Sequence, residues 1–126
     1  MELDRLLSIE NCPYLNRIPE WKWMQPHEVI QWVNAYAKAD KETKALKAEL
    51  LMCGFDKKDH RYWIGSGFID VDEHPVPRES GAALVAIHVD PQSRRPGIGK
   101  RMMENLCKAA DLCSVSLALS IRPFFL

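Results

Sequence analysis

The stretch AALVAIHV (residues 82–89) and the segment DPQSRRPGIGK (residues 90–100) that follows it decide the fold of this chain. The first stretch is a nearly continuous apolar run, which is typical of a strand covered on both faces. Pro91 ends that strand. From Gly97 to about Asp111 the apolar residues recur at helical spacing, and the inner face of that helix carries Ile98, Met102, Leu106, Ala109 and Cys113. The sequence therefore predicts a strand, a glycine-containing turn and an amphipathic helix.

The turn between the two elements has the chemistry of a phosphate site. Glycines remove the Cβ atoms that would block a close approach, so successive backbone N–H groups point at a pyrophosphate. The helix N-terminus adds its partial positive charge. Four basic residues lie within eight positions, although the whole chain has 17 basic and 17 acidic residues: Arg94, Arg95, Lys100 and Arg101. The alternative is an ordinary surface turn, because Gly-x-Gly beside basic residues is common.

Residues 87–100 resemble motif A of the GNAT N-acetyltransferases, in which a strand ends in a Gln/Arg-x-x-Gly-x-Gly/Ala turn that opens a helix. Arg94, Gly97 and Gly99 occupy the motif positions. The resemblance implies transfer of an acetyl group from acetyl-CoA to an amine of a small molecule or of a protein, at a lysine or the N-terminus, without a metal. It assigns the pantetheine arm to Ile87, His88 and Val89, and the pyrophosphate to Arg94, Arg95, Pro96, Gly97, Ile98, Gly99 and Lys100. A dinucleotide-binding fold needs a third glycine where Met102 stands, so that alternative fails.

The general base is harder to place. Histone-acetylating members of the family carry a base glutamate near the start of this strand, where Ala82 and Ala83 stand here. The remaining candidate catalytic residues are His88, Glu73 and Glu79. For His88 a buried core histidine is favoured over a base, because its strand looks covered on both sides. For the two glutamates simple solvation in a loop is favoured.

The rest of the chain fits one GNAT-like domain over residues 1–126, of α/β (α+β) class, with N-terminal helices and a mixed sheet. Residues 1–25 read as an irregular arm anchored by Trp21 and Trp23, and residues 26–54 as two helices with a bend near Asp40. Strands are expected over 61–89, with a hairpin or bulge near residue 66 and an exposed loop over 72–80. Residues 90–111 form the coenzyme turn and helix, and 114–126 the last strand and tail.

The sequence stops after this last strand, whereas a typical GNAT member continues with a tyrosine-bearing helix and two more strands. We therefore expect a C-terminally truncated member, and the alternative function is a non-catalytic truncated module that binds a partner protein. The strand Val115 to Ile121 should expose an edge that pairs with something. The cover is a second copy of the chain, the N-terminal arm or a different protein, and a homodimer is favoured.

Composition excludes several other classes. A net charge of zero removes the field that draws a protein to nucleic acid or membrane, and no apolar stretch is long enough to span a bilayer. The lysines of residues 38–47 alternate with acidic residues, which favours a solvated helix face. The four cysteines are scattered, without zinc-ligand spacing, and are expected to be reduced thiols: Cys12, Cys53, Cys107 and Cys113. With no secretory signal at the start, we expect a cytoplasmic protein.

Overall fold

The computed structural model describes residues 14–18, 20–90 and 97–119. The described elements are two 3-10 turns, two α-helices and five strands: η1 (Leu15–Arg17), η2 (Trp21–Trp23), α2 (Pro26–Met52), β1 (Asp56–Lys58), β2 (Arg61–Ile64), β3 (Gly67–His74), β4 (Gly81–Val89), α3 (Ile98–Leu112) and β5 (Leu117–Leu119). The strands form one sheet in the order β1-β2-β3-β4-β5. All neighbouring strands are antiparallel except β4 and β5, which are parallel. The predicted mixed sheet preceded by helix is confirmed.

Helix α2 is a single helix of 27 residues, so the predicted bend near Asp40 is wrong. Neither glycine nor proline interrupts the sequence after Pro26, which occupies the first helical turn. The two apolar stripes predicted on either side of Asp40 are one stripe, because the small buried side chains of Ala39 and Thr43 continue it. A short side chain is enough to bury a helix face where the sheet approaches closely.

Strands β2 and β3 form a tight hairpin, in which Ile64 pairs with Gly67. The sequence allowed either a hairpin or a bulge near residue 66, and the structure shows the hairpin. Strand β3 then runs to His74, so the exposed loop expected from residue 72 begins only after it. Residues 72–74 are held in the sheet by backbone pairing with residues 81–83 of β4, which outweighs their polar character.

A β-bulge separates two halves of strand β4 that differ in burial. Asp70 of β3 pairs with Ala86 and the adjacent Val71 pairs with Leu84, so Val85 is the extra residue of a β-bulge. Residues 81–84 before the bulge are buried, whereas residues 85–89 after it are half-buried. The expectation of a strand covered on both faces along its whole length is therefore wrong for its second half.

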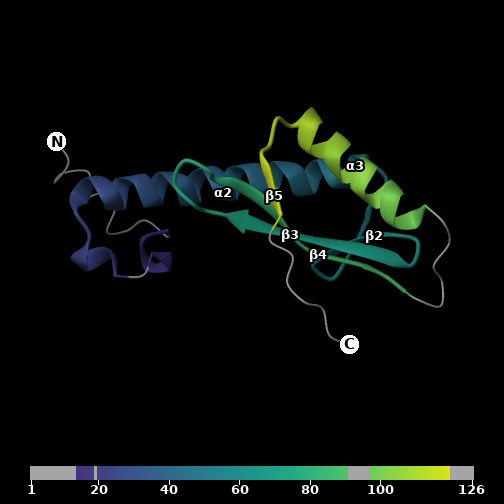
Figure 1. The fold of residues 1–126 in the computed structure, drawn as a ribbon, viewed down its shortest axis with the longest axis horizontal. Coiled ribbons are helices and arrows are strands. Elements are labelled where there is room, and N and C mark those ends of the chain that lie inside the picture. Colours follow the sequence, from purple (N-terminus) through teal and green to yellow (C-terminus); the bar gives the residue numbers. More distant parts are fainter. Residues whose placement is uncertain (1–13, 19, 91–96, 120–126) are drawn as a thin grey trace.

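The main core lies on one face of the sheet, beneath both helices. Figure 1 shows α2 and α3 on the same side of the strands. Helix α2 contributes Leu46 and Leu50, and α3 contributes Met102 and Leu106, each fully buried. These side chains pack in one cluster with the inward-facing residues of β2, β3 and β4: Tyr62, Ile64, Ile69, Val71, Ala82 and Leu84. The cluster fixes the position of α3 relative to the sheet.

The described part of the N-terminal arm packs on the first half of α2 and forms a second, smaller cluster. Leu15 and Ile18 are buried there against Val29 and Val33, and Trp21 packs beside them. Trp23 is 88 % exposed, so the prediction that both tryptophans anchor the arm holds only for Trp21. Because these described contacts go to α2, this part of the arm is not the cover for β5 that the sequence left open.

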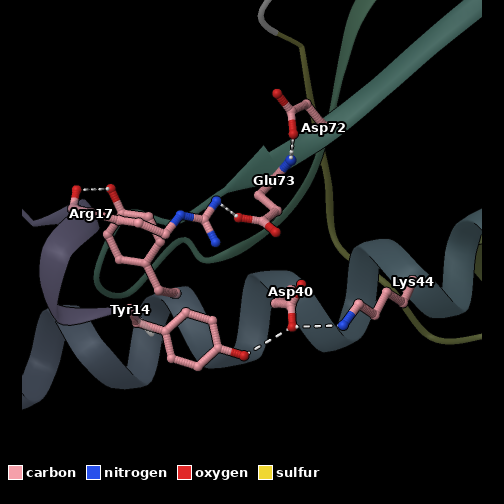
Figure 2. A network of polar contacts seen from close by, with 7 residues as sticks. Tyr14, Arg17, Asp40, Lys44, Asp72 and Glu73 are labelled. Atoms are coloured by element: carbon pink, nitrogen blue, oxygen red, sulfur yellow. Dashed lines mark hydrogen bonds and ion pairs between the residues drawn. The ribbon is translucent and has the colours of Figure 1, made fainter. Parts of the chain in front are cut away.

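Polar contacts fasten the arm to α2 in addition to this cluster (Figure 2). Tyr14 Oη donates a hydrogen bond of 2.9 Å to Asp40 Oδ2, and Lys44 Nζ donates one of 3.2 Å to the same oxygen. These two hydrogen bonds, that of Tyr14 first, hold the pKa of Asp40 below its ordinary value of 3.8. A carboxyl group whose pKa falls on folding stabilises the folded state in its ionised form.

The Tyr14 hydrogen bond gives a pH-dependent prediction. Tyr14→Phe should lower the free energy of unfolding by about 1 kcal/mol near neutral pH, because a charged acceptor loses its donor. The contribution of Asp40 is fully present above the carboxyl's ordinary pKa and disappears as the pH falls through its lower folded-state pKa. Urea denaturation of wild type and variant at several pH values should therefore show a difference that shrinks in acid.

Tyr36→Phe is the matched control for this prediction. Tyr36 Oη donates a hydrogen bond of 3.0 Å to the backbone carbonyl oxygen of Arg17, which does not titrate. Its removal should cost a similar free energy of unfolding at every pH. A Tyr14→Phe effect that is as independent of pH as the Tyr36→Phe effect would contradict the assigned role of Asp40.

Candidate functional site

The strand, turn and helix predicted to hold the coenzyme are β4, the turn at Gly97 and α3. Gly97 is the N-cap of α3 and adopts φ +97°, a left-handed conformation that glycine adopts without strain. Its carbonyl oxygen accepts a hydrogen bond of 2.8 Å from the N–H of Arg101. Its N-cap residue, a glycine, has no side chain to cap the helix, and its first turn contains no acidic residue. The N-terminus of α3 therefore has the features of an anion site.

Gly99 is the more informative of the two turn glycines. Its φ is not positive, and a Cβ atom placed on it would meet no heavy atom of the described structure within 4 Å. Neither backbone strain nor a close neighbour among the described residues thus requires glycine at this position. The open space beside Gly99, in the first turn of α3, is where an anionic group would approach the helix N-terminus.

The charge around this turn is positive in its described part. Lys100 and Arg101 are exposed at the start of α3. Lys100 Nζ lies 3.8 Å from Glu104 Oε1, and both side chains are largely exposed, so that ion pair is weak. Three of the residues predicted to bind the coenzyme lie outside the described residues: Arg94, Arg95 and Pro96.

The second half of β4 offers backbone groups beside the turn. Strand β5, as far as it is described, pairs only with Ala82, Ala83 and Leu84. From the bulge at Val85 onward, β4 has β3 on one side, and no described strand pairs with its other side. Among the residues predicted to contact pantetheine, Ile87 and Val89 pack against the core cluster. On the side of β4 where no described strand pairs, the backbone groups of these residues suit an extended ligand.

His88 lies on the opposite face of the sheet from Ile87 and Val89. It is half-buried, and its ring centroid is 5.5 Å from that of Phe68, its cross-strand partner. Phe68 is 2 % exposed and also contacts Trp63, with 4.9 Å between the centroids. His88 is therefore not the fully buried core histidine that the sequence favoured. It is held in an aromatic group on the face that the two helices leave open.

The other two candidate bases lie far from His88. Glu73 forms an ion pair with the guanidinium of Arg17 (Figure 2). Its carboxylate therefore faces the arm, on the helix side of the sheet. Glu79 is exposed in the segment before β4, and its carboxylate lies 4.0 Å from His74 Nε2. From the start of β4 to His88 the strand spans roughly 23 Å. The structure thus does not bring His88, Glu73 and Glu79 together in one site.

Asp70 is a carboxylate beside the bulge that the sequence analysis did not single out. It is half-buried and pairs with Ala86, the first residue after the bulge. Cross-strand partners share a face, so Asp70 lies on the same face as His88. Burial raises the pKa of Tyr62 on the neighbouring strand, and the Asp70 carboxylate raises it further. Only the strand register, which is not local in sequence, identifies Asp70.

Three other features bear on function. No helix within residues 14–18, 20–90 and 97–119 is long and apolar enough to cross a membrane. In the same ranges, no group of three or more His, Cys, Asp or Glu side chains is arranged to hold a metal ion. The described cysteines are free thiols: Cys53, Cys107 and Cys113.

Comparison with known proteins identifies the family. A family model described as the acetyltransferase (GNAT) family matches residues 8–121. Searches of the curated proteins and of the solved structures returned no significant match. The family match includes β4, the Gly97 turn, α3 and the described part of β5, which are the elements that build the candidate site. The chain belongs to the GNAT acetyltransferase family.

Proposed function

We propose that this protein transfers the acetyl group of acetyl-CoA to an amine of a small molecule or a protein. Membership of the GNAT family supports an acetyltransferase function in general. The observation that carries the coenzyme assignment is the N-terminus of α3, which has a glycine as its N-cap residue, no acidic residue in its first turn and, among the described residues, open space beside Gly99. These features favour a ligand with a pyrophosphate.

In the proposed complex the coenzyme lies along the second half of β4 and ends on α3. The pyrophosphate takes hydrogen bonds from N–H groups of the first turn of α3, with Arg94, Arg95 and Lys100 balancing its charge. The pantetheine arm pairs with backbone groups of residues 87–89, on the side of β4 where no described strand lies. This arrangement puts the thioester near the bulge at Val85.

The transfer step needs a proton acceptor near that bulge. The amine nitrogen attacks the thioester carbonyl carbon, the new C–N bond forms, and the C–S bond breaks to release the coenzyme thiolate. The attacking amine gives a proton to a base, and the thiolate takes up a proton. We assign the base to Asp70, because it lies opposite Ala86, whose methyl side chain leaves room beside the carboxylate. His88 is two residues further along β4 and packs on Phe68.

The coenzyme assignment predicts the effect of Gly99→Val. The added side chain fills the space beside the helix N-terminus, so the affinity for acetyl-CoA should fall by at least about tenfold. The melting temperature should change little, because the new Cβ meets no described atom. Isothermal titration calorimetry and thermal unfolding measure the two quantities separately. Gly97→Val is less suitable, because its positive φ strains any side chain.

Ala48→Val provides the matched control for Gly99→Val. It also adds a β-branched residue to a helix, at an exposed position of α2 away from the turn. Ala48→Val should bind acetyl-CoA as the wild type does. The coenzyme assignment is rejected if Gly99→Val binds acetyl-CoA with the affinity of the Ala48→Val protein.

The base assignment predicts different effects of two substitutions. Asp70→Asn should lower kcat by about a hundredfold or more, because it removes the proton acceptor, and His88→Gln should retain measurable transfer. Release of free coenzyme thiol with a panel of lysine peptides and small polyamines measures the rate. Both variants should bind acetyl-CoA as the wild type does. Loss of turnover in His88→Gln, with unchanged melting temperature and acetyl-CoA affinity, would make His88 the base instead.

A further inference from the structure

A cavity of about 320 Å³ lies at the opposite end of β4 from the coenzyme turn. It is an open hollow lined by the segment that joins β3 to β4, by Lys38 of α2 and by the start of β5. A second hollow of about 260 Å³ lies beside it along α2. Lys38, Arg78 and Ser80 border both spaces. The larger space is of the size that small-molecule ligands occupy.

The shared wall of the two spaces is positively charged. Lys38 and Arg78 are exposed, and among the described residues neither side chain has an ion pair or hydrogen bond. Two serines also line the larger cavity, the buried Ser80 and Ser116. The one carboxylate-bearing residue in this lining is Glu79, which is largely exposed and lies beside His74. Two cationic residues and two serines therefore border one small space.

Arg78 has a backbone conformation that arginine rarely adopts. The N–H of Glu79 donates a hydrogen bond of 3.0 Å to the carbonyl oxygen of Val76, which defines a four-residue turn with Pro77 in second place. Proline fixes a negative φ there, and Arg78 in third place has φ +73°, so the turn is of type II. Glycine or asparagine ordinarily occupies that position. The turn itself does not explain an arginine.

We propose that this cavity is a phosphate-binding site, separate from the coenzyme turn, for a small molecule with a phosphate monoester group. A guanidinium binds two phosphate oxygens side by side, an ammonium adds a point charge, and hydroxyl groups donate to the remaining oxygens. The two positive charges of Lys38 and Arg78 match the double negative charge of a phosphate monoester. The length of β4 separates this site from the N-terminus of α3.

The phosphate belongs either to a separate ligand or to the amine acceptor. Ala118 lines the cavity and pairs with Ala83, two residues before the bulge at Val85. An acceptor held here by its phosphate would extend toward the place where the thioester is proposed to lie. A phosphate on the amine acceptor presupposes the proposed acetyl transfer, whereas phosphate binding itself does not.

The test is an amide NMR titration with inorganic phosphate as the probe, in the presence of excess dephospho-coenzyme A, which fills the coenzyme turn with its pyrophosphate but carries no phosphate monoester. Sodium chloride at equal ionic strength is the control for charge screening. Saturable shifts at the amides of Ser80 and Ser116 are expected. No saturable shift at these amides at millimolar phosphate, or shifts confined to residues 97–100, would overturn the proposal. The readout at Ser80 and Ser116 remains valid if dephospho-coenzyme A does not bind, so the two proposals fail separately.

Three variants connect the shifts to the side chains. Lys38→Gln and Arg78→Gly should each weaken phosphate binding by about tenfold or more. Lys41→Gln, which removes a lysine of the same helix outside the cavity, should leave it within about twofold. Arg78→Gly should keep the wild-type melting temperature or raise it, because glycine suits the positive φ. Equal phosphate affinity in wild type, Lys38→Gln and Arg78→Gly would also overturn the proposal.

Phosphoethanolamine and ethanolamine then distinguish the two sources of the phosphate. Faster acetyl transfer to phosphoethanolamine than to ethanolamine, reduced in Arg78→Gly, would assign the phosphate to the acceptor. Binding of phosphoethanolamine without acetyl transfer would assign it to a separate ligand. Both results support the site, and failure of phosphoethanolamine to compete with inorganic phosphate at Ser80 would reject a site for phosphate monoesters.

Discussion

The parallel pairing of β4 with β5 is the constraint on which the candidate site depends. Two parallel neighbours cannot be joined by a tight turn, so the chain must leave β4, cross over in a helix and return to the same end of the sheet. That crossover places the N-terminus of α3 at the carboxyl end of β4. Met102 and Leu106 fix α3 in the core against Leu46 and Leu50 of α2. The helix N-terminus is thus held by packing on two elements.

The bulge at Val85 divides β4 into a half that pairs with β5 and a half along which no described strand pairs on that side. Before it, residues 81–84 are buried, and residues 82–84 pair with strands on both sides. After it, the strand is half-buried, and its side chains alternate between the core and the open face. Figure 1 shows the two helices on the core face, and the strand register places Asp70 and His88 together on the opposite face. The division separates the groups that stabilise the fold from the groups that are candidates for chemistry.

Helix α2 links the two ends of β4. At 27 residues it is roughly 40 Å long, so it reaches from the arm and the cavity at Lys38 to the core beneath α3. The described part of the arm adds contacts near the Lys38 end of β4, through Tyr14 on Asp40 and Arg17 on Glu73. The proposed phosphate site therefore includes a residue of α2 itself, whereas the proposed coenzyme site is connected to α2 through the core packing of α3.

The sequence by itself determined the strand, the glycine turn and the helix of the candidate coenzyme site, because alternation, helical spacing and glycine placement are local patterns. It also predicted the β2–β3 hairpin region. It could not predict the continuity of α2, because Ala39 and Thr43 count as an apolar face only where the sheet lies close. The bulge at Val85, the position of Asp70 opposite Ala86 and the cavity beside Arg78 were decided by the tertiary structure alone. Each depends on which residues of separate strands and helices lie side by side, and that register is set by packing between elements distant in sequence.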